Sequence, residues 1–274
     1  MFKTLTAVAV AALTMVGGAQ AATVSTIDLF STKQTKLTDS TVGGIMASEI
    51  GSAGDTTILG GFREIMVDQK FNAGNAEEST IAVSGGLLKF SNEFGASATG
   101  IVRWDGATAS TGVPAGALAT EHLTSGGAIN VTGLGGLDIG NVFTDFFELQ
   151  VTFADGAYFF RIDAYTSATR WSTVQIAANQ HPLPITSYIP LLAFLDCTNS
   201  VPPGPPLVTV TCGSAGPVDF DNLGALQAVI DVDGTAAALD LALNQVTVVP
   251  EPNAIALVGL ALLGAGVASR RRKV

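Results

Sequence analysis

Residues 146–165 read FFELQVTFADGAYFFRIDAY, and they carry the strongest local structural signal in the chain. From Phe147 to Phe153 apolar and polar side chains alternate, so that one face of an extended strand would be apolar and the other polar. Residues 158–165 form a second stretch rich in aromatic and β-branched side chains. The intervening Asp155-Gly156 pair is typical of a two-residue hairpin turn. This segment therefore predicts two adjacent antiparallel strands and an all-β fold.

Similar stretches recur along the chain, separated by clusters of Gly, Asn, Asp and Ser. Strands are predicted at 23–30, 58–67, 79–83, 87–91, 99–104, 146–153, 158–165, 171–177, 207–212, 226–232 and 237–248. Short helical turns are predicted only at 45–50, 115–123 and 183–192, and residues 106–127 read as a long loop. Neither a repeat nor a linker divides this body. The expectation is a single antiparallel β-sandwich, jelly-roll-like in its topology.

The body of the chain is strongly acidic. The 274 residues include 13 basic and 23 acidic side chains, and five of the bases lie in the terminal segments described below. The body thus carries eight bases against 23 acids, a net charge of −15. Such a surface repels nucleic acid and anionic lipid, and excludes both as expected partners.

Two cysteines, Cys197 and Cys212, are predicted to form a disulfide that closes a loop of 14 intervening residues. On a loop-entropy basis such a link stabilises the fold by about 3 kcal/mol. Residues 201–206, VPPGPP, lie in this loop and cannot form regular structure.

The last 25 residues contain three unlike segments in a fixed order. The tripeptide Pro250-Glu251-Pro252 comes first, an apolar run over residues 254–268 follows, and the chain then ends with Arg270, Arg271, Arg272, Lys273 and Val274. The apolar run can form a transmembrane helix, and the cations would hold its end on the cytoplasmic side. Fifteen residues span only about 22 Å of a hydrocarbon core of about 30 Å, so the anchor would be marginal.

This order resembles the PEP-CTERM sorting signal. The resemblance implies that the membrane protease exosortase recognises the tripeptide and removes the tail. It also implies export across the inner membrane, transient anchoring there, and a final place at the cell surface or in an extracellular matrix. A permanent tail anchor is the alternative for the apolar run.

The N-terminus agrees with export. Lys3, an apolar run over residues 5–16 and Ala19-Gln20-Ala21 are typical of a secretory signal peptide, which requires signal peptidase and the secretion machinery. The expected organisation is therefore a signal peptide at 1–21, a β-sandwich domain at 22–248 and a sorting signal at 249–274.

The body has a weaker resemblance of its own, to a surface domain found in PEP-CTERM proteins and similar to carbohydrate-binding β-sandwiches. The motifs that carry it are LGGFREI at 59–65, VRWDG at 102–106, GLGGLDI at 133–139, VDFDN at 218–222 and LDLALNQV at 239–246. This resemblance implies a setting of exopolysaccharide or biofilm.

No catalytic motif is recognisable in the sequence. The two histidines, His122 and His181, lack metal-ligand spacing, and neither a nucleophile elbow nor a phosphate-binding loop is present. Paired carboxylates could come from any strands, and Glu64, Asp105, Glu148 and Asp163 are candidates by their position on or beside predicted strands. No enzymatic activity is expected, and a secreted polysaccharide-acting enzyme remains the alternative.

Binding is suggested by two further features. Trp104 and Trp171 each follow an arginine, and an exposed indole could serve as a platform for a sugar ring. Asp219, Asp221, Asp231 and Asp233 lie in acidic turns and offer oxygen ligands suited to a structural calcium ion, although they lack the EF-hand pattern. Burial of the tryptophans and ordinary turn formation by the aspartates are the competing interpretations. The sequence thus leaves open a glycan-binding role and a purely structural or adhesive role in the matrix.

Overall fold

A computed structural model describes residues 25–74, 76–106, 129–198 and 208–250. The expected signal peptide, the apolar tail, His122, the helical turn at 115–123 and residues 201–206 lie outside the described residues. Among the residues that are described, no helix has the length and apolar character needed to span a bilayer.

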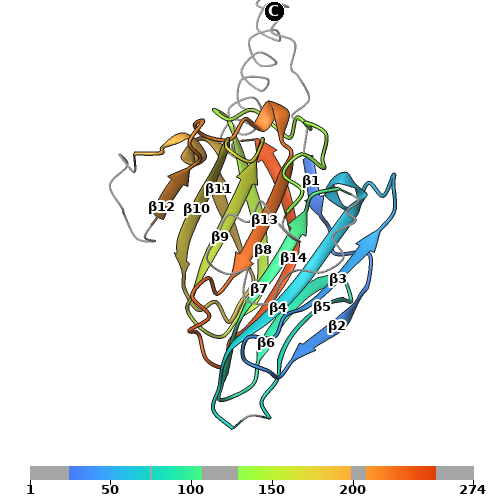
Figure 1. Cartoon of the computed structure of the whole chain (residues 1–274), viewed down its shortest axis with the longest axis vertical. Helices are drawn as coiled ribbons and strands as arrows, with labels where there is room; N and C mark the ends of the chain where they lie inside the picture. Colours follow the sequence, from blue (N-terminus) through green and yellow to red (C-terminus); the bar gives the residue numbers. More distant parts are fainter. Residues whose placement is uncertain (1–24, 75, 107–128, 199–207, 251–274) are drawn as a thin grey trace, which may run out of the picture.

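The body is an all-β sandwich of two antiparallel sheets, as predicted (Figure 1). The first sheet contains β1 (Ser25–Asp28), β2 (Gln34–Asp39), β5 (Ser79–Ser84), β6 (Leu87–Asn92), β8 (Asp145–Ala154), β11 (Ile185–Pro190) and β14 (Asp240–Pro250). The second contains β3 (Met46–Gly51), β4 (Phe62–Asn72), β7 (Ala96–Trp104), β9 (Tyr158–Tyr165), β10 (Trp171–Ala178), β12 (Val208–Cys212) and β13 (Ala225–Ile230). Three short 3-10 turns complete the described part: η1 (Leu59–Gly61), η2 (Leu191–Leu195) and η3 (Phe220–Asn222).

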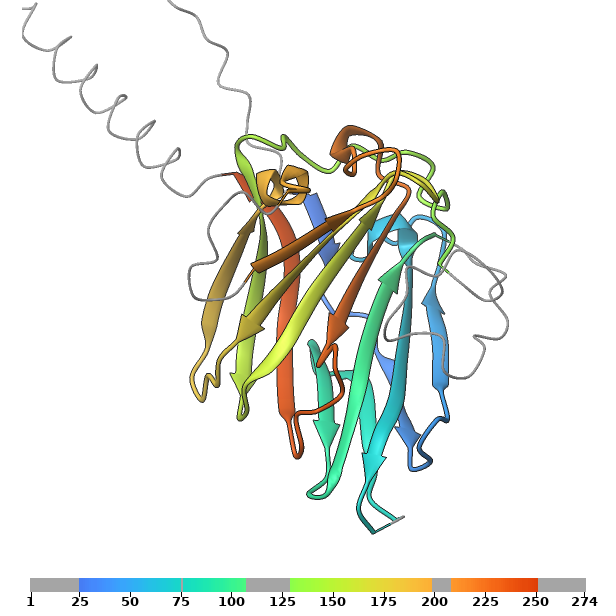
Figure 2. The ribbon, with the colours of Figure 1, turned by 60° about the vertical axis from the view of Figure 1, so that its left-hand side comes forward.

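The strand order sets which residues meet. The first sheet runs β11-β8-β14-β6-β5-β2, with β1 pairing the other half of β14, and the second runs β12-β10-β9-β13-β7-β4-β3. The two sheets lie face to face (Figure 2). Alternate residues of each strand point into the space between the sheets, and they form one large apolar core that includes Phe90, Phe147, Val102, Ile162 and Leu226. The jelly-roll classification remains an expectation.

The predicted hairpin at Asp155-Gly156 is wrong, although both of its strands exist. β8 pairs with β11 and β14 in the first sheet, whereas β9 pairs with β10 and β13 in the second. Neither Asp155 nor Gly156 has the positive φ that a type I′ turn requires. The backbone of Ala154 instead pairs with His181, and the Asp155 carboxylate accepts the Asp240 N–H at 2.7 Å. The chain therefore crosses between the sheets at this point.

A two-residue hairpin does form at Gly85-Gly86. Both glycines have positive φ, at 64° and 75°, and Ser84 pairs with Leu87 across the turn. Because residues other than glycine strain at these angles, this pair fixes the register of β5 and β6.

Two of the predicted helical turns, at 45–50 and 183–192, are wrong, because both regions contain strands. Residues 46–51 form β3, which pairs with β4 along its whole length. Residues 185–190 form the edge strand β11, and a 3-10 turn begins only at Leu191. In both places the local sequence lacks clean alternation, and a neighbouring strand supplies the backbone partners.

Candidate functional site

Trp104 is not exposed, and the prediction that it serves as a platform for a sugar ring is wrong. Its side chain is only 1% exposed, because β7 directs it into the core between the sheets. The indole Nε1 donates to Asp28 Oδ2 at 2.8 Å. A buried tryptophan with its N–H bonded has no free face or donor for a sugar.

Asp28 and Arg63 form a fully buried ion pair beside this tryptophan, and both side chains are 0% exposed. Arg63 Nη1 donates to both carboxylate oxygens, at 2.9 and 3.1 Å, and Arg63 Nε donates to Gln34 Oε1 at 2.9 Å. Arg63 Nη2 donates to the Thr32 carbonyl at 2.6 Å. The pair thus links β1 and the β1–β2 loop of one sheet to β4 and β7 of the other.

Sequence reasoning missed this cluster, although the sequence does contain a signal. Arg63 shares the strand phase of Ile65 and Val67, which point into the core. A charged residue on the apolar phase of a strand requires a buried partner. Asp28 is that partner.

A second polar network crosses the outer face of the second sheet. Glu64, Arg103, Gln227 and Asp163 occupy one row on the adjacent strands β4, β7, β13 and β9. Arg103 donates to Glu64 Oε2 and to Gln227 Oε1, each at 3.1 Å, and Gln227 Nε2 donates to Asp163 Oδ2 at 2.9 Å. Arg161 completes the row through a bond of its Nη2 to Asp163 Oδ2 at 3.1 Å.

We call this network the buried polar row. All five side chains are at most 8% exposed. Glu64 and Asp163 are three strand spacings apart, or about 14 Å at 4.8 Å per strand. That separation exceeds the roughly 5–10 Å between the two carboxyl groups of a glycosidase. The row therefore does not bring these two candidates together.

Asp105 and Glu64 do approach each other at one end of the row. Asp105 follows β7 two residues after Arg103, which pairs with Glu64, and Glu49 of β3 pairs with Glu64 on its other side. Burial raises the pKa of Glu64 to about 7, against the opposing effect of Arg103, and the Asp105 and Glu49 carboxylates raise it further. Burial also raises the pKa of Asp105, whose Oδ2 accepts the Asn130 N–H at 2.7 Å.

The four aspartates predicted as calcium ligands are not assembled into a metal site. Within the described parts of the chain, no group of three or more His, Cys, Asp or Glu side chains is placed to hold a metal ion. Asp231 Oδ2 accepts the Ala236 N–H at 2.9 Å, and Asp219 Oδ1 accepts the Asp221 N–H at 3.3 Å. These carboxylates stabilise turns.

Trp171 and Glu148 lie on different sheets, Trp171 on β10 and Glu148 on β8. Trp171 is partly buried against the small apolar cluster of Ile129, Tyr165 and Ala225. Glu148 lies on the outer face of the first sheet, opposite Tyr188 of β11, and its Oε1 accepts bonds from Gln150 Nε2 at 2.9 Å and Gln245 Nε2 at 3.4 Å. Tyr188 is 45% exposed. An exposed ring beside a carboxylate and two amides is an arrangement that can contact a sugar.

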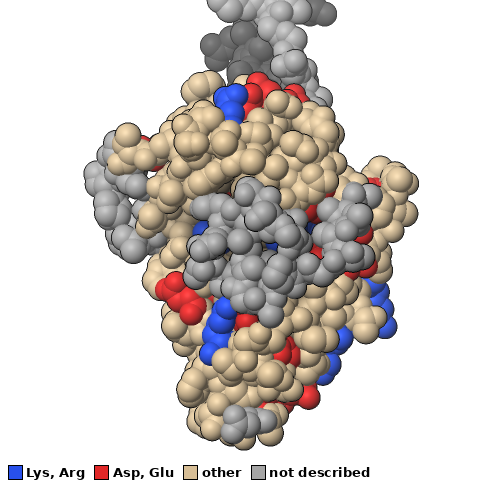
Figure 3. Space-filling model, viewed as in Figure 1, with Lys and Arg blue, Asp and Glu red and all other residues tan. Residues whose placement is uncertain are grey.

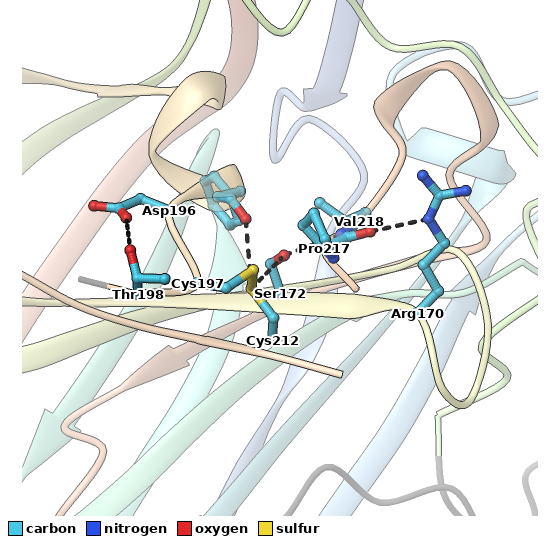
Figure 4. The surroundings of a disulfide bond; sticks show 9 residues. Arg170, Ser172, Asp196, Cys197, Thr198, Cys212, Pro217 and Val218 are labelled. Atoms are coloured by element: carbon cyan, nitrogen blue, oxygen red, sulfur yellow. Dashed lines mark hydrogen bonds between the residues drawn. A yellow bond between two sulfur atoms is a disulfide. The ribbon is translucent and has the colours of Figure 1, made fainter. Parts of the chain in front are cut away.

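The predicted disulfide is confirmed. Cys197, just after η2, is bonded to Cys212 at the end of β12, with 5.4 Å between the Cα atoms (Figure 4). Ser172 Oγ lies 3.6 Å from Cys212 Sγ and accepts the Val218 N–H at 3.0 Å. The link therefore ties the edge strand β12 to the turn that covers that end of the core.

The tripeptide begins inside the fold. Pro250 is the last residue of β14 and pairs with Asp145, while Glu251, Pro252 and the basic residues lie outside the described part. β14 lies between β8 and the strands β6 and β1, so the sorting segment continues directly from a central strand.

Comparison with known families identifies this segment. Residues 248–273 match the model of the PEP-CTERM protein-sorting motif. The chain is therefore exported and sorted by exosortase, its processing partner, after transient anchoring in the membrane. No curated protein matches the chain.

Proposed function

We propose that the chain is a non-enzymatic protein of the cell surface or extracellular matrix, with a structural or adhesive role among exopolysaccharide. The observation that carries this proposal is the buried polar row. Its charged groups are paired with one another across four strands, and an arrangement of this kind holds a sheet together.

The surface charge is consistent with this role. On the face seen in Figure 3, acidic and basic side chains are scattered among uncharged ones rather than gathered in one patch. A dispersed negative charge supports solubility and does not favour a polyanionic partner. Neutral polysaccharide is compatible with such a surface.

A deletion strain would test the role directly. Complementation with the wild-type gene should restore matrix cohesion, and complementation with Glu64→Gln and Asp105→Asn variants should restore it equally. Failure of both variants, when each reaches the surface in normal amounts, would favour the enzymatic alternative, because Glu64 and Asp105 are two candidate carboxylates that interact with each other. Hydrolysis of purified exopolysaccharide by the wild-type protein would contradict the proposal outright.

Glycan binding is a second candidate, supported by the outer face of β11 and β8. Tyr188 packs edge-on against Phe146, with 6.5 Å between ring centroids, so its ring is held in place beside Glu148. Tyr188→Ala should then weaken binding on a glycan array. Thr209→Ala, at an exposed position on β12 of the other sheet, is the control and should leave binding unchanged. Wild-type binding by Tyr188→Ala would contradict a glycan site on this face.

A further inference from the structure

The folded body ends only a few residues before the membrane anchor. Pro250 pairs with Asp145 in the first sheet, and the apolar run begins at residue 254. Three residues lie between them, so even a fully extended chain spans only about 14 Å from Pro250 to residue 254. While the tail is in the bilayer, the end of the sandwich that contains Pro250 must therefore lie at the membrane surface.

The N-terminal strand emerges at the same end. β1 is antiparallel to β14, and Ser25 pairs with Val248. Both ends of the folded body thus face the same side, and the opposite side contains the turns between β2 and β3 and between β6 and β7 (Figure 1).

Two large apolar side chains lie exposed beside the exit of β14. Phe143 is 75% exposed and lies two residues before Asp145, the partner of Pro250. Leu192 is 47% exposed and lies two residues after Pro190, which pairs with Phe146 on the far side of β8. The backbone of both residues is fixed by neighbours. The Phe143 N–H donates to Asn141 Oδ1 at 2.9 Å, and Leu191, which precedes Leu192, is fully buried.

We propose that Phe143 and Leu192 form a membrane-contact surface, which inserts into the interface of the lipid bilayer while the chain is anchored. We infer that lipid covers this surface, because the few residues between Pro250 and the apolar run keep this end of the sandwich beside the bilayer for as long as the chain is anchored. Apolar side chains at the level of the headgroups gain free energy by leaving water. Asp138 and Asp221 lie in the loop and turn at this end, so neutral headgroups suit it better than anionic ones.

This contact would hold the sandwich upright. The end that contains Val42, Phe71 and Phe94 would then point away from the bilayer, towards the matrix. Phe94 is 91% exposed in the turn between β6 and β7, and it offers a control of the same chemical type at the far end.

The test uses residues 22–274 reconstituted through the tail into phosphatidylcholine vesicles. Because Cys197 and Cys212 are joined to each other, a single new thiol can be labelled without reductant. Phe143→Cys, Leu192→Cys and the control Phe94→Cys would each carry a polarity-sensitive fluorophore. Flotation first verifies that each variant is anchored, which separates a failure of anchoring from a failure of the contact.

The label at 143 and at 192 should shift its emission to the blue and lose intensity when spin-labelled lipid is present. The label at 94 should show neither change. The same labels on chains that end at Pro250 supply the reference in water. Labels at 143 and 192 that behave like the label at 94 in anchored protein would overturn the proposal.

Discussion

Replacing Trp104 with alanine should destabilise the protein severely, because this side chain fills the core and also completes the Asp28–Arg63 cluster. Truncation of a buried tryptophan costs about 3–5 kcal/mol through lost burial and the cavity that remains. Loss of the indole N–H leaves Asp28 Oδ2 with Arg63 Nη1 as its donor, and the loss of one hydrogen bond to this buried carboxylate costs about 1–3 kcal/mol more. The expected loss is therefore about 4–8 kcal/mol.

That loss is a large share of the 5–15 kcal/mol that stabilises a typical domain. Urea denaturation of the exported protein, followed by circular dichroism, would measure it. With an m-value of about 2–3 kcal/mol/M, the midpoint should fall by about 2 M. Trp104→Phe keeps most of the ring but lacks the N–H, and should lose only about 1–3 kcal/mol.

Trp171→Ala provides a contrast, because Trp171 is only partly buried. It should cost clearly less than Trp104→Ala. A Trp104→Ala protein within about 1 kcal/mol of the wild type, with an unchanged m-value, would refute the assignment of this residue to the core.

Three further predictions concern processing, the disulfide and pH. Glu251→Ala should block tail removal, and mass spectrometry of surface-released wild-type protein should find a chain that ends near this residue; an intact C-terminus would contradict this. Reduction of Cys197–Cys212 should cost about 3 kcal/mol and release β12 first, which hydrogen exchange would detect as faster exchange at 208–212 than in β9. Burial raises the pKa of Glu64 to about 7 and that of Asp231 to about 6, so the folded state binds these protons more tightly than the unfolded state. Stability should fall as pH rises from about 4.5 to 7, by an amount on the order of 3 kcal/mol for Glu64 alone, and Glu64→Gln should flatten the profile.

Several features could be predicted from the sequence because their signals are local. Alternation along β8 requires only that one face be buried, and the strand is present where the pattern places it. The paired cysteines and the order of tripeptide, apolar run and cations are also local signals, and the disulfide and the sorting motif are both confirmed.

Only the tertiary structure decided which strands pair. The Asp155-Gly156 turn favours a hairpin by itself, but His181 and Asp240 take the backbone and side-chain bonds that would close it. Those partners lie about 25 and 85 residues further along the chain, where no local pattern reveals them.

The tertiary structure also decided the fate of the candidate site residues. Trp104 occurs in a strand that could present either face to solvent, and both faces of β7 are buried. Asp28 and Arg63 are 35 positions apart and belong to different sheets. Since a buried charge is tolerated only with its partner in place, their roles follow from packing between the sheets and not from the residues themselves.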